Sequence, residues 1–261
     1  MNTDVRESKF GKYANDYAKH RAGFPDSFFN RIFKLEKFEN TSTLLDLGTG
    51  TGTLARRFSK EGLKVTGLDL DEEMIKASKE LDKAEGLKIE YIQSSANKIP
   101  LENQSFDLIS AGQCWHWFSS SAIDEVQRIL KPSGLLLIAY FDWIIKDDNP
   151  VDLMYKLKSN YVPDEGSNEN RWPLGFYPQK PDDLDFEQME LQEAALWEEE
   201  IPYTHDSWLG RLRAYSGLSS RLSSVEIDNF ILEYSELLKN KFPENNLKIP
   251  HKLWFGLWKV R

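Results

Sequence analysis

The stretch that decides the fold is Thr41–Phe58, which reads TSTLLDLGTGTGTLARRF. An apolar segment leads to Asp46, glycines alternate at Gly48, Gly50 and Gly52, and a helical pattern follows. Glycine adopts backbone angles that other residues avoid and lets a ligand approach the main chain closely. A strand, a glycine-rich loop and a helix in this order predict a ligand site at the carboxyl edge of a doubly wound sheet.

Strands and helices alternate along the segment that contains this loop. Strands are predicted at 43–48, 64–70, 88–93, 105–111 and 135–141, and helices at 53–60, 71–84 and 121–130, with a turn at 131–134. The strands read as short, nearly continuous apolar runs. Such a rhythm is typical of a parallel sheet that is covered by helices on both faces.

The remaining segments predict additional helices and two closing strands. Helices are expected at 7–21, 26–37, near 151–160, at 206–220 and at 224–241, and strands at 191–201 and 251–261. We therefore expect an α/β, doubly wound, Rossmann-like fold with a seven-stranded, mostly parallel sheet, N-terminal helices and a helical cap inserted in the C-terminal half. A single domain over 1–261 would suit this length. The expected parts are a core of about 40–145, closing strands at about 190–201 and 251–261, and cap elements at about 1–37, 146–189 and 206–241.

Composition narrows the class of protein. The 261 residues carry a formal net charge of −9 and no basic patch, which argues against a nucleic-acid partner. No apolar run approaches the roughly 20 residues that a membrane-spanning helix needs, and the first residues lack a signal-peptide core. We expect a cytoplasmic protein without membrane insertion, either a monomer or a homodimer. Cys114 is the only cysteine and the four histidines are scattered, so we expect no metal site.

Two cofactors that contain adenosine are candidates for the glycine-rich loop, NAD and S-adenosylmethionine. Dinucleotides are typically bound by Gly-x-Gly-x-x-Gly, whereas the glycines here follow the pattern Gly-x-Gly-x-Gly, with Asp46 two residues before the first. A carboxylate is a poor neighbour for a pyrophosphate but suits the ammonium and sulfonium groups of S-adenosylmethionine. Asp69 ends the second strand and can accept hydrogen bonds from ribose hydroxyls of either cofactor. The loop therefore favours S-adenosylmethionine over NAD.

A resemblance to a known family is carried by four segments, LLDLGTGTGTL, VTGLDLDEEMIKASKE, YIQSSANKIPLENQSFDLISAGQCWHWF and EVQRILKPSGLLLIAYF. In this order and spacing they resemble the class I S-adenosylmethionine-dependent methyltransferases. The resemblance is greatest to the small-molecule, methyltransferase-11 branch that includes the trans-aconitate methyltransferases. It extends from the N-terminal FGKYANDYAKHRAGFP to about Tyr140.

The resemblance also implies which residues bind the cofactor. They are Asp46, Gly48, Gly50 and Gly52 for the methionine part, Asp69 for the ribose, Leu70, Ser95, Ala96 and Asn97 around the adenine, Gln113 near the methyl donor, and Tyr17 and Arg21 on the N-terminal helix. Asn97 stands where the family often has an acid. Its amide oxygen can accept a hydrogen bond from the adenine amine, without charge assistance.

The sequence AGQCWHWF follows the fourth predicted strand, where the reacting groups should meet. Trp115 and Trp117 would wall a substrate site, and His116 could act as a general base or pack against a backbone carbonyl. Cys114 is expected to be a small buried residue. Farther along, the pair Arg213 and Tyr215 could meet an anionic acceptor or lie on a solvated helix face.

The function that these features favour is methyl transfer to a small-molecule acceptor by in-line displacement, with a carboxylic acid as one candidate acceptor. Alignment of two bound reactants can lower a barrier by roughly 7–11 kcal/mol, so no elaborate acid–base constellation is needed. Two alternatives stay open at this point. One is an NAD-dependent oxidoreductase, and the other is a catalytically silent scaffold that keeps the cofactor fold.

Overall fold

The computed structural model describes residues 23–36, 38–39, 41–163, 186 and 188–261. These residues belong to two compact units, each built from several chain segments. The sheet unit comprises Ala22–Ile144, Trp172–Glu200 and Pro250–Arg261, and the helical unit comprises Met1–Arg21, Ile145–Arg171 and Ile201–Ile249. The helix expected at 7–21, which carries Tyr17 and Arg21, lies outside the described residues.

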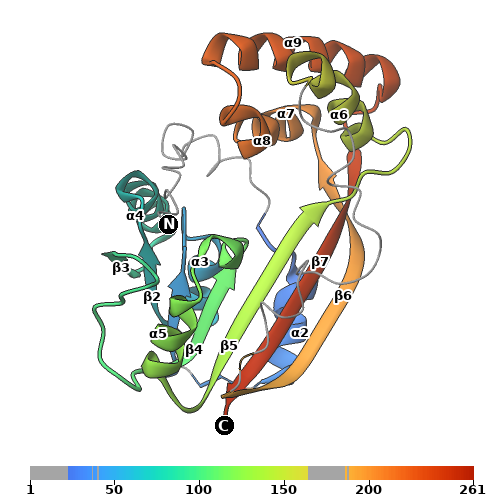
Figure 1. The fold of residues 1–261 in the computed structure, drawn as a ribbon. Coiled ribbons are helices and arrows are strands. Elements are labelled where there is room, and N and C mark those ends of the chain that lie inside the picture. The colour runs from blue at the N-terminus through green and yellow to red at the C-terminus, as the bar shows by residue number, and fades with distance from the viewer. Residues whose placement is uncertain (1–22, 37, 40, 164–185, 187) are drawn as a thin grey trace. The chain divides into compact units, whose positions relative to one another are not determined.

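Among the described residues, seven strands form one sheet in the order β3-β2-β1-β4-β5-β7-β6 (Figure 1). Their bounds are Thr43–Leu47 for β1, Lys64–Asp69 for β2, Glu90–Gln93 for β3, Phe106–Gly112 for β4, Leu130–Trp143 for β5, Met189–Tyr203 for β6 and Leu247–Val260 for β7. The first five strands pair in parallel, and β7 runs antiparallel to β5. This arrangement confirms the predicted Rossmann-like, mostly parallel sheet.

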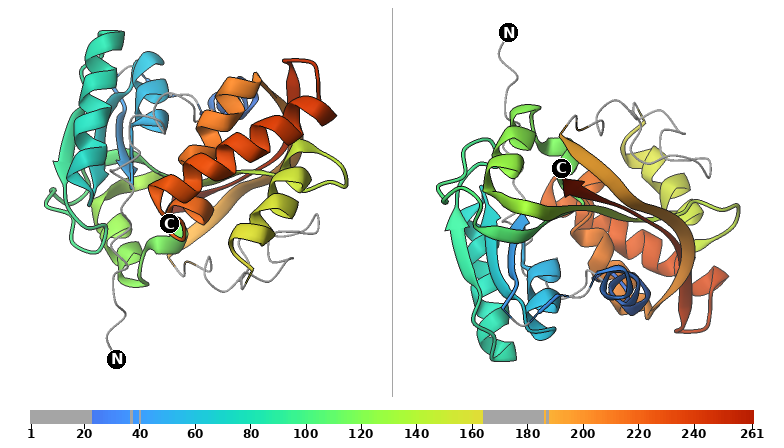
Figure 2. Two further views of the ribbon diagram at one scale, coloured as in Figure 1. Left: turned by 90° about the horizontal axis from the view of Figure 1, so that it is seen from above. Right: turned by 90° about the horizontal axis from the view of Figure 1, so that it is seen from below.

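Helices flank the strands at the places that the sequence predicted. In the sheet unit they are α2 Asp26–Leu35, α3 Thr53–Lys60, α4 Glu72–Glu85, the short 3-10 helix η2 Trp115–Trp117 and α5 Ser121–Ile129. Figure 2 shows this unit from two further directions, with α4 alongside β2 and β3. The helical unit contains α6 Pro150–Tyr161, α7 His205–Arg213, α8 Ser216–Ser219 and α9 Ser224–Lys241. None of the helices in the described ranges combines the length and apolar character needed to cross a bilayer.

The core of the sheet unit lies on the central strands and under α2. Leu45 of β1 and Leu136 of β5 are fully buried, as expected for parallel strands covered on both faces. Helix α2 turns its buried face toward the sheet, where the ring of Phe28 meets that of Phe255 edge-on at 6.1 Å. Ring pairs of this kind add stability beyond the area that they bury.

The helical unit has a core of its own in which a tyrosine hydroxyl joins three elements. The indole nitrogen of Trp208 on α7 donates to the hydroxyl of Tyr234 on α9 at 2.9 Å. That hydroxyl in turn donates to the carbonyl of Pro150, at the start of α6, at 2.6 Å. Both aromatic side chains are fully buried, so their polar atoms need these partners.

The turn predicted at 131–134 is wrong as a break between elements, because β5 already begins at Leu130. Phe106 of β4 pairs with Leu130, but Leu108 pairs with Leu135, so β5 advances five residues while β4 advances two. The extra residues form a bulge in which Ser133 has a φ of 62°. The Pro-Ser-Gly composition that suggested a turn is thus accommodated within a strand.

The packing of α2 gives a first testable prediction. Replacing Phe28 with alanine should lower the free energy of unfolding by about 3–5 kcal/mol, because a fully buried ring leaves a cavity. The exposed Leu35 on the same helix provides a matched control, and Leu35→Ala should cost far less. Urea denaturation followed by tryptophan fluorescence measures both. Equal losses for the two variants would contradict the assignment of α2 as a core helix.

Candidate functional site

The three alternating glycines form the connection between β1 and α3, and all three have left-handed backbone angles. Their φ values are 57° at Gly48, 55° at Gly50 and 77° at Gly52. A Cβ atom at Gly48 would lie 2.9 Å from Cys114, and one at Gly52 would lie 2.6 Å from the hydroxyl of Tyr91. At Gly50 it would meet nothing within 4 Å. Two glycines are therefore required by internal packing, whereas Gly50 faces open space.

The glycine loop is held by hydrogen bonds from its backbone amides. Thr49 N–H donates to the carbonyl of Leu68 at 3.0 Å, and Gly52 N–H donates to the carbonyl of Thr49 at 2.9 Å. Gly50 N–H donates to a carboxylate oxygen of Asp69 at 2.7 Å. The conformation of the loop is therefore set largely by the end of the neighbouring strand β2.

Asp69 connects this loop to the next helix. Its second carboxylate oxygen accepts the backbone N–H of Asp71 at 2.9 Å. Asp71 itself caps α4, because its side chain accepts the N–H groups of Glu73 and Met74. Burial raises the pKa of Asp69, while its hydrogen bonds with backbone amides oppose this shift. Contact between this carboxylate and the ribose hydroxyls of a cofactor stays a prediction.

Asp46 lies beneath the loop and is only 2% exposed. Its two oxygens accept hydrogen bonds from the hydroxyls of Ser110 at 2.6 Å and Thr49 at 2.7 Å. Burial raises the pKa of Asp46 to about 6. The carboxylate thus fixes Thr49, and through it the loop. Direct contact between Asp46 and the methionine part of a cofactor stays a prediction.

The residues predicted to surround the adenine lie after β2 and β3. Leu70 is 58% exposed, which is unusual for a leucine directly after a buried strand. Ala96 is buried, and Ser95 accepts the backbone N–H of Asn97 at 3.2 Å. The amide oxygen of Asn97 accepts a hydrogen bond from the hydroxyl of Ser119 at 2.8 Å. This oxygen therefore already has one donor before any adenine amine is considered.

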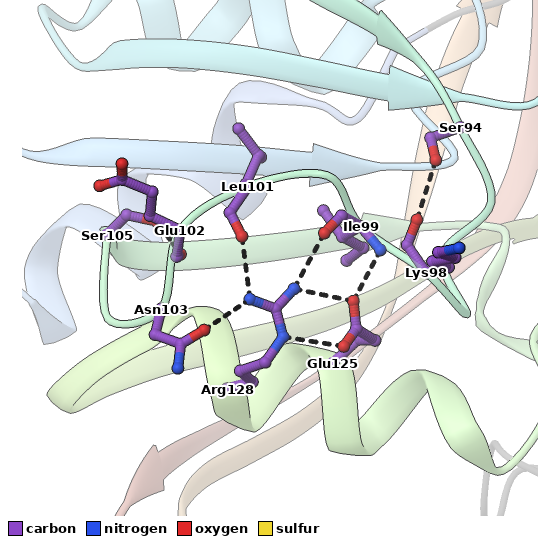
Figure 3. A network of polar contacts seen from close by, with 9 residues as sticks. All are labelled: Ser94, Lys98, Ile99, Leu101, Glu102, Asn103, Ser105, Glu125 and Arg128. Atoms are coloured by element: carbon purple, nitrogen blue, oxygen red, sulfur yellow. Dashed lines mark hydrogen bonds and ion pairs between the residues drawn. The ribbon is translucent and has the colours of Figure 1, made fainter.

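An ion pair on α5 fixes the segment that follows these residues (Figure 3). The guanidinium of Arg128 donates to the carbonyls of Ile99 and Leu101, both at 2.9 Å, and to the side-chain oxygen of Asn103 at 2.7 Å. It also pairs with Glu125 at 2.8 Å, and Glu125 accepts the N–H of Ile99 at 2.6 Å. Sequence reasoning missed this network. Its only signal was an acid and an arginine three residues apart on one helix.

Gln113 stands directly after β4, as predicted, with a left-handed φ of 65°. Its backbone N–H donates to the carbonyl of Ala139 at 2.8 Å, and its side-chain amide donates to the carbonyl of Phe141. Gln113 therefore joins the end of β4 to β5. Its predicted position near a methyl donor is neither supported nor opposed by these contacts.

The predicted aromatic walls separate into two environments. The ring of Trp115 packs against Phe118 and Phe186, each with ring centroids at 5.6 Å, and so belongs to the core. Trp117 is 60% exposed. Between them, Nδ1 of His116 lies 3.3 Å from the hydroxyl of Tyr140, which also accepts the backbone N–H of His116 at 3.2 Å. Tyr140 was not among the predicted site residues.

The protonation state of His116 follows from these surroundings. Burial lowers the pKa of His116, because the charged imidazolium loses water. The ring is therefore neutral at pH 7 and has one nitrogen able to accept a proton. This state is the one that a general base requires.

Three further residues were predicted from the sequence: Arg213 and Tyr215 as possible acceptor contacts, and Cys114 as a small buried residue. In the helical unit, Arg213 pairs with Asp228, and the hydroxyl of Tyr215 lies 2.9 Å from that of Tyr155. Their predicted contact with an acceptor stays a prediction. The buried thiol of Cys114 lies 3.1 Å from the carbonyl of Leu47, which confirms it as a small packed residue. Within the described ranges, no group of three or more His, Cys, Asp or Glu side chains could hold a metal ion.

The strand order and the glycine loop define a Rossmann-like α/β protein with its glycine loop at the carboxyl edge of the parallel strands. Comparison with known proteins agrees with this class. Residues 45–138 match the family described as "Methyltransferase domain". The uncharacterized methyltransferase C25B8.09 of Schizosaccharomyces pombe is 32% identical over 136 residues, which cover 51% of each chain. A malonyl-[acyl-carrier protein] O-methyltransferase of Erwinia pyrifoliae is 29% identical over 141 residues, covering 53% of this chain and 52% of that protein.

A solved structure extends the likeness of fold beyond the matched segment. It is a candidate type II methyltransferase from Anaeromyxobacter dehalogenans, with a TM-score of 0.65 and 18% identity, covering 92% of this chain and 97% of that one. The chain spans about half the length of the curated relatives that it matches. Residues 45–138 of this chain are therefore similar to the methyltransferase domain of these proteins.

The ion pair of α5 predicts a specific pH dependence of stability. Arg128 lowers the pKa of Glu125 from its ordinary value of 4.5 to about 2. A depressed pKa stabilises the fold above pH 4.5, and this contribution is lost as the pH falls toward 2. Glu125→Gln should therefore cost about 1–3 kcal/mol at pH 7, and the difference from wild type should shrink between pH 4.5 and 2.

Thermal or urea unfolding at several pH values measures this difference. Glu61 is a suitable control, because it forms an exposed pair with Arg57 on α3. Glu61→Gln should change stability by less than about 0.5 kcal/mol. A cost for Glu125→Gln that stays constant down to pH 2 would show that the Glu125 charge does not stabilise the fold.

Proposed function

We propose that this protein is an S-adenosylmethionine-dependent methyltransferase that transfers a methyl group to a small-molecule acceptor by in-line displacement. The observation that carries the proposal is the conformation of Gly50. This residue has a left-handed backbone, faces open space, and is held from behind by the carboxylate of Asp69. A loop fixed in this way offers its main chain to a ligand that needs close approach.

The residues of the site fit this cofactor. Asp69 ends β2 with a half-buried carboxylate, a group that can accept hydrogen bonds from ribose hydroxyls, and Leu70 exposes an apolar surface suited to one face of an adenine. The carboxylates of Asp46, which is buried, and Asp69, which is half-buried, bring negative charge to the loop, which favours a ligand with a positive charge. The cofactor would supply an electrophilic methyl group on a sulfonium. The role of this chain is to bind, align and exclude water.

We further propose that the acceptor presents an oxygen nucleophile, with a carboxylic acid as the favoured class. A carboxylate is already ionised at pH 7 and needs no base. If the acceptor is a hydroxyl compound instead, neutral His116 is the group we assign as base, with Tyr140 fixing its ring. The relative from Erwinia pyrifoliae is named an O-methyltransferase, which supports an oxygen nucleophile.

The two alternatives are weaker. An NAD-dependent oxidoreductase is disfavoured by the glycine spacing, by Asp46 under the loop, and by relatives that are named as methyltransferases. A catalytically silent scaffold would not need the open position at Gly50 or the carboxylate of Asp69. The net charge of −9 also favours a small-molecule acceptor over nucleic acid. The predicted cytoplasmic location, and the choice between monomer and homodimer, remain predictions.

Isothermal titration with S-adenosylmethionine, and in parallel with NAD, tests the proposed cofactor. We expect a saturable one-to-one isotherm with S-adenosylmethionine and none with NAD. Binding of NAD alone would overturn the proposal. After binding is shown, methyl transfer is tested with small carboxylic acids first. Tight binding without turnover on any acceptor class would favour the silent scaffold.

A matched pair of glycines separates backbone strain from ligand contact. Gly50 and Gly86, at the end of α4, both have positive φ values, 55° and 69°, and both leave a Cβ atom with nothing within 4 Å. Replacing either with alanine should lower the free energy of unfolding by about 1–2 kcal/mol. Only Gly50→Ala should weaken the binding of S-adenosylmethionine. The affinity should fall about tenfold if the alanine methyl group raises the free energy of binding by about 1.4 kcal/mol.

Calorimetry and thermal unfolding of the two glycine variants decide this point. Equal affinities for the cofactor in both variants would mean that the glycine loop is not the binding site. Weaker binding in both variants would mean that global stability, and not contact at Gly50, controls the affinity.

A further inference from the structure

A buried polar cluster lies under the glycine loop and plays no part in the function proposed above. It is formed by Arg56 of α3, Asp82 of α4 and Tyr91 of β3. Asp82 is only 4% exposed, and its carboxylate lies 3.5 Å from the guanidinium of Arg56. The same guanidinium lies 3.5 Å from Glu85. Within the described residues, both oxygens of Asp82 and the hydroxyl of Tyr91 are buried without a hydrogen-bond partner.

This cluster touches the loop at two points. Arg56 donates a hydrogen bond to the backbone carbonyl of Thr51, which lies between the last two glycines. The hydroxyl of Tyr91 and the guanidinium of Arg56 lie 2.6 Å and 3.0 Å from the place where a Cβ atom of Gly52 would be. The ring of Tyr91 also lies 2.6 Å from the corresponding place at Gly67. Tyr91 thus fills the space that two glycines leave.

Stability alone is a poor explanation for such a cluster. A buried ion pair loses hydration that its attraction often fails to recover, and the 3.5 Å separation here is longer than a hydrogen bond. Burial raises the pKa of Asp82, and Arg56 opposes this shift. The hydrogen bond from Arg56 to the carbonyl of Thr51 links this cluster to the glycine loop. The consequence of the cluster is therefore the orientation of Thr51 and of the glycines beside it.

We propose that Arg56, Asp82 and Tyr91 are positioning residues that hold the glycine loop in its cofactor-binding conformation. Asp82 orients the guanidinium of Arg56, Arg56 fixes the carbonyl of Thr51, and Tyr91 supports Gly52 from below. None of the three is assigned contact with the cofactor or the acceptor. This inference rests on the proposed function, because the loop is assumed to bind the cofactor. The loop conformation itself can be measured without any cofactor.

Hydrogen–deuterium exchange of the cofactor-free, full-length protein reads the loop directly. The amides of Thr49, Gly50 and Gly52 are hydrogen-bonded and so should exchange slowly in the wild type. Asp82→Asn keeps the shape of the side chain but removes the charge that orients Arg56. We expect about tenfold faster exchange at these amides, and about tenfold weaker binding of S-adenosylmethionine.

Substitutions of Arg56 separate its charge from its geometry. Arg56→Gln should have the same effects as Asp82→Asn, and Arg56→Lys should recover part of the cofactor affinity. If Asp82→Asn does not fold, the two Arg56 variants test the same contact with Thr51. Lys76→Ala is the matched control, because Lys76 lies on α4, the helix of Asp82, and pairs with Glu73 at 2.7 Å on the exposed surface. It should leave loop exchange and cofactor affinity unchanged.

The outcomes distinguish this inference from the proposed function. Faster loop exchange in Asp82→Asn and Arg56→Gln, but not in Lys76→Ala, supports the positioning role. If those two variants lose thermal stability while loop exchange and affinity match the wild type, the cluster is merely structural and the inference fails. Failure of the wild type to bind S-adenosylmethionine would overturn the proposed function, whereas the exchange data would still decide the positioning role.

Discussion

The carboxylate of Asp69 is the group on which the site depends. It ends β2 and accepts one backbone amide from the glycine loop, at Gly50, and one from Asp71, where α4 begins. A single side chain therefore holds both the loop between β1 and α3 and the start of α4 after β2. Hydrogen bonds to an ionised carboxylate are among the stronger ones in proteins, so the loop and the helix start are fixed relative to each other before any ligand arrives.

The negative charges at and near this carboxylate favour a positively charged ligand over a negatively charged one. Asp46 is buried and Asp69 is half-buried, and each has a raised pKa, with the charge of Asp69 contributing to the shift at Asp46. A cation near the loop would relieve this repulsion, whereas a pyrophosphate would increase it. The same acid that fixes the backbone thus also favours a sulfonium or ammonium ligand. In the function proposed above, support of the loop and choice of cofactor would therefore have a common physical origin.

The fold was largely predictable, because buried parallel strands read as continuous apolar runs and glycines mark their ends. Helix α3 spans Thr53–Lys60 as predicted, and the cap of α4 at Asp71 was recognisable from its acidic first turn. The polar networks were not predictable. Arg128 bonds to Ile99, 29 residues away, and Arg56 meets Asp82 across two helices. Such contacts depend on tertiary packing, which a local pattern does not encode.

Because of the bulge at the start of β5, the number of residues in this segment can change without changing the geometry of the site. Pairing with β4 resumes at Leu135, and from there each residue faces its partner without interruption as far as Ala139. Tyr140, which contacts His116, follows directly and pairs with Trp254 of β7. Residues gained or lost between Lys131 and Gly134 would therefore change the size of the bulge and leave the downstream register intact. The bulge is a place where this architecture can vary in length over evolution without moving its reactive edge.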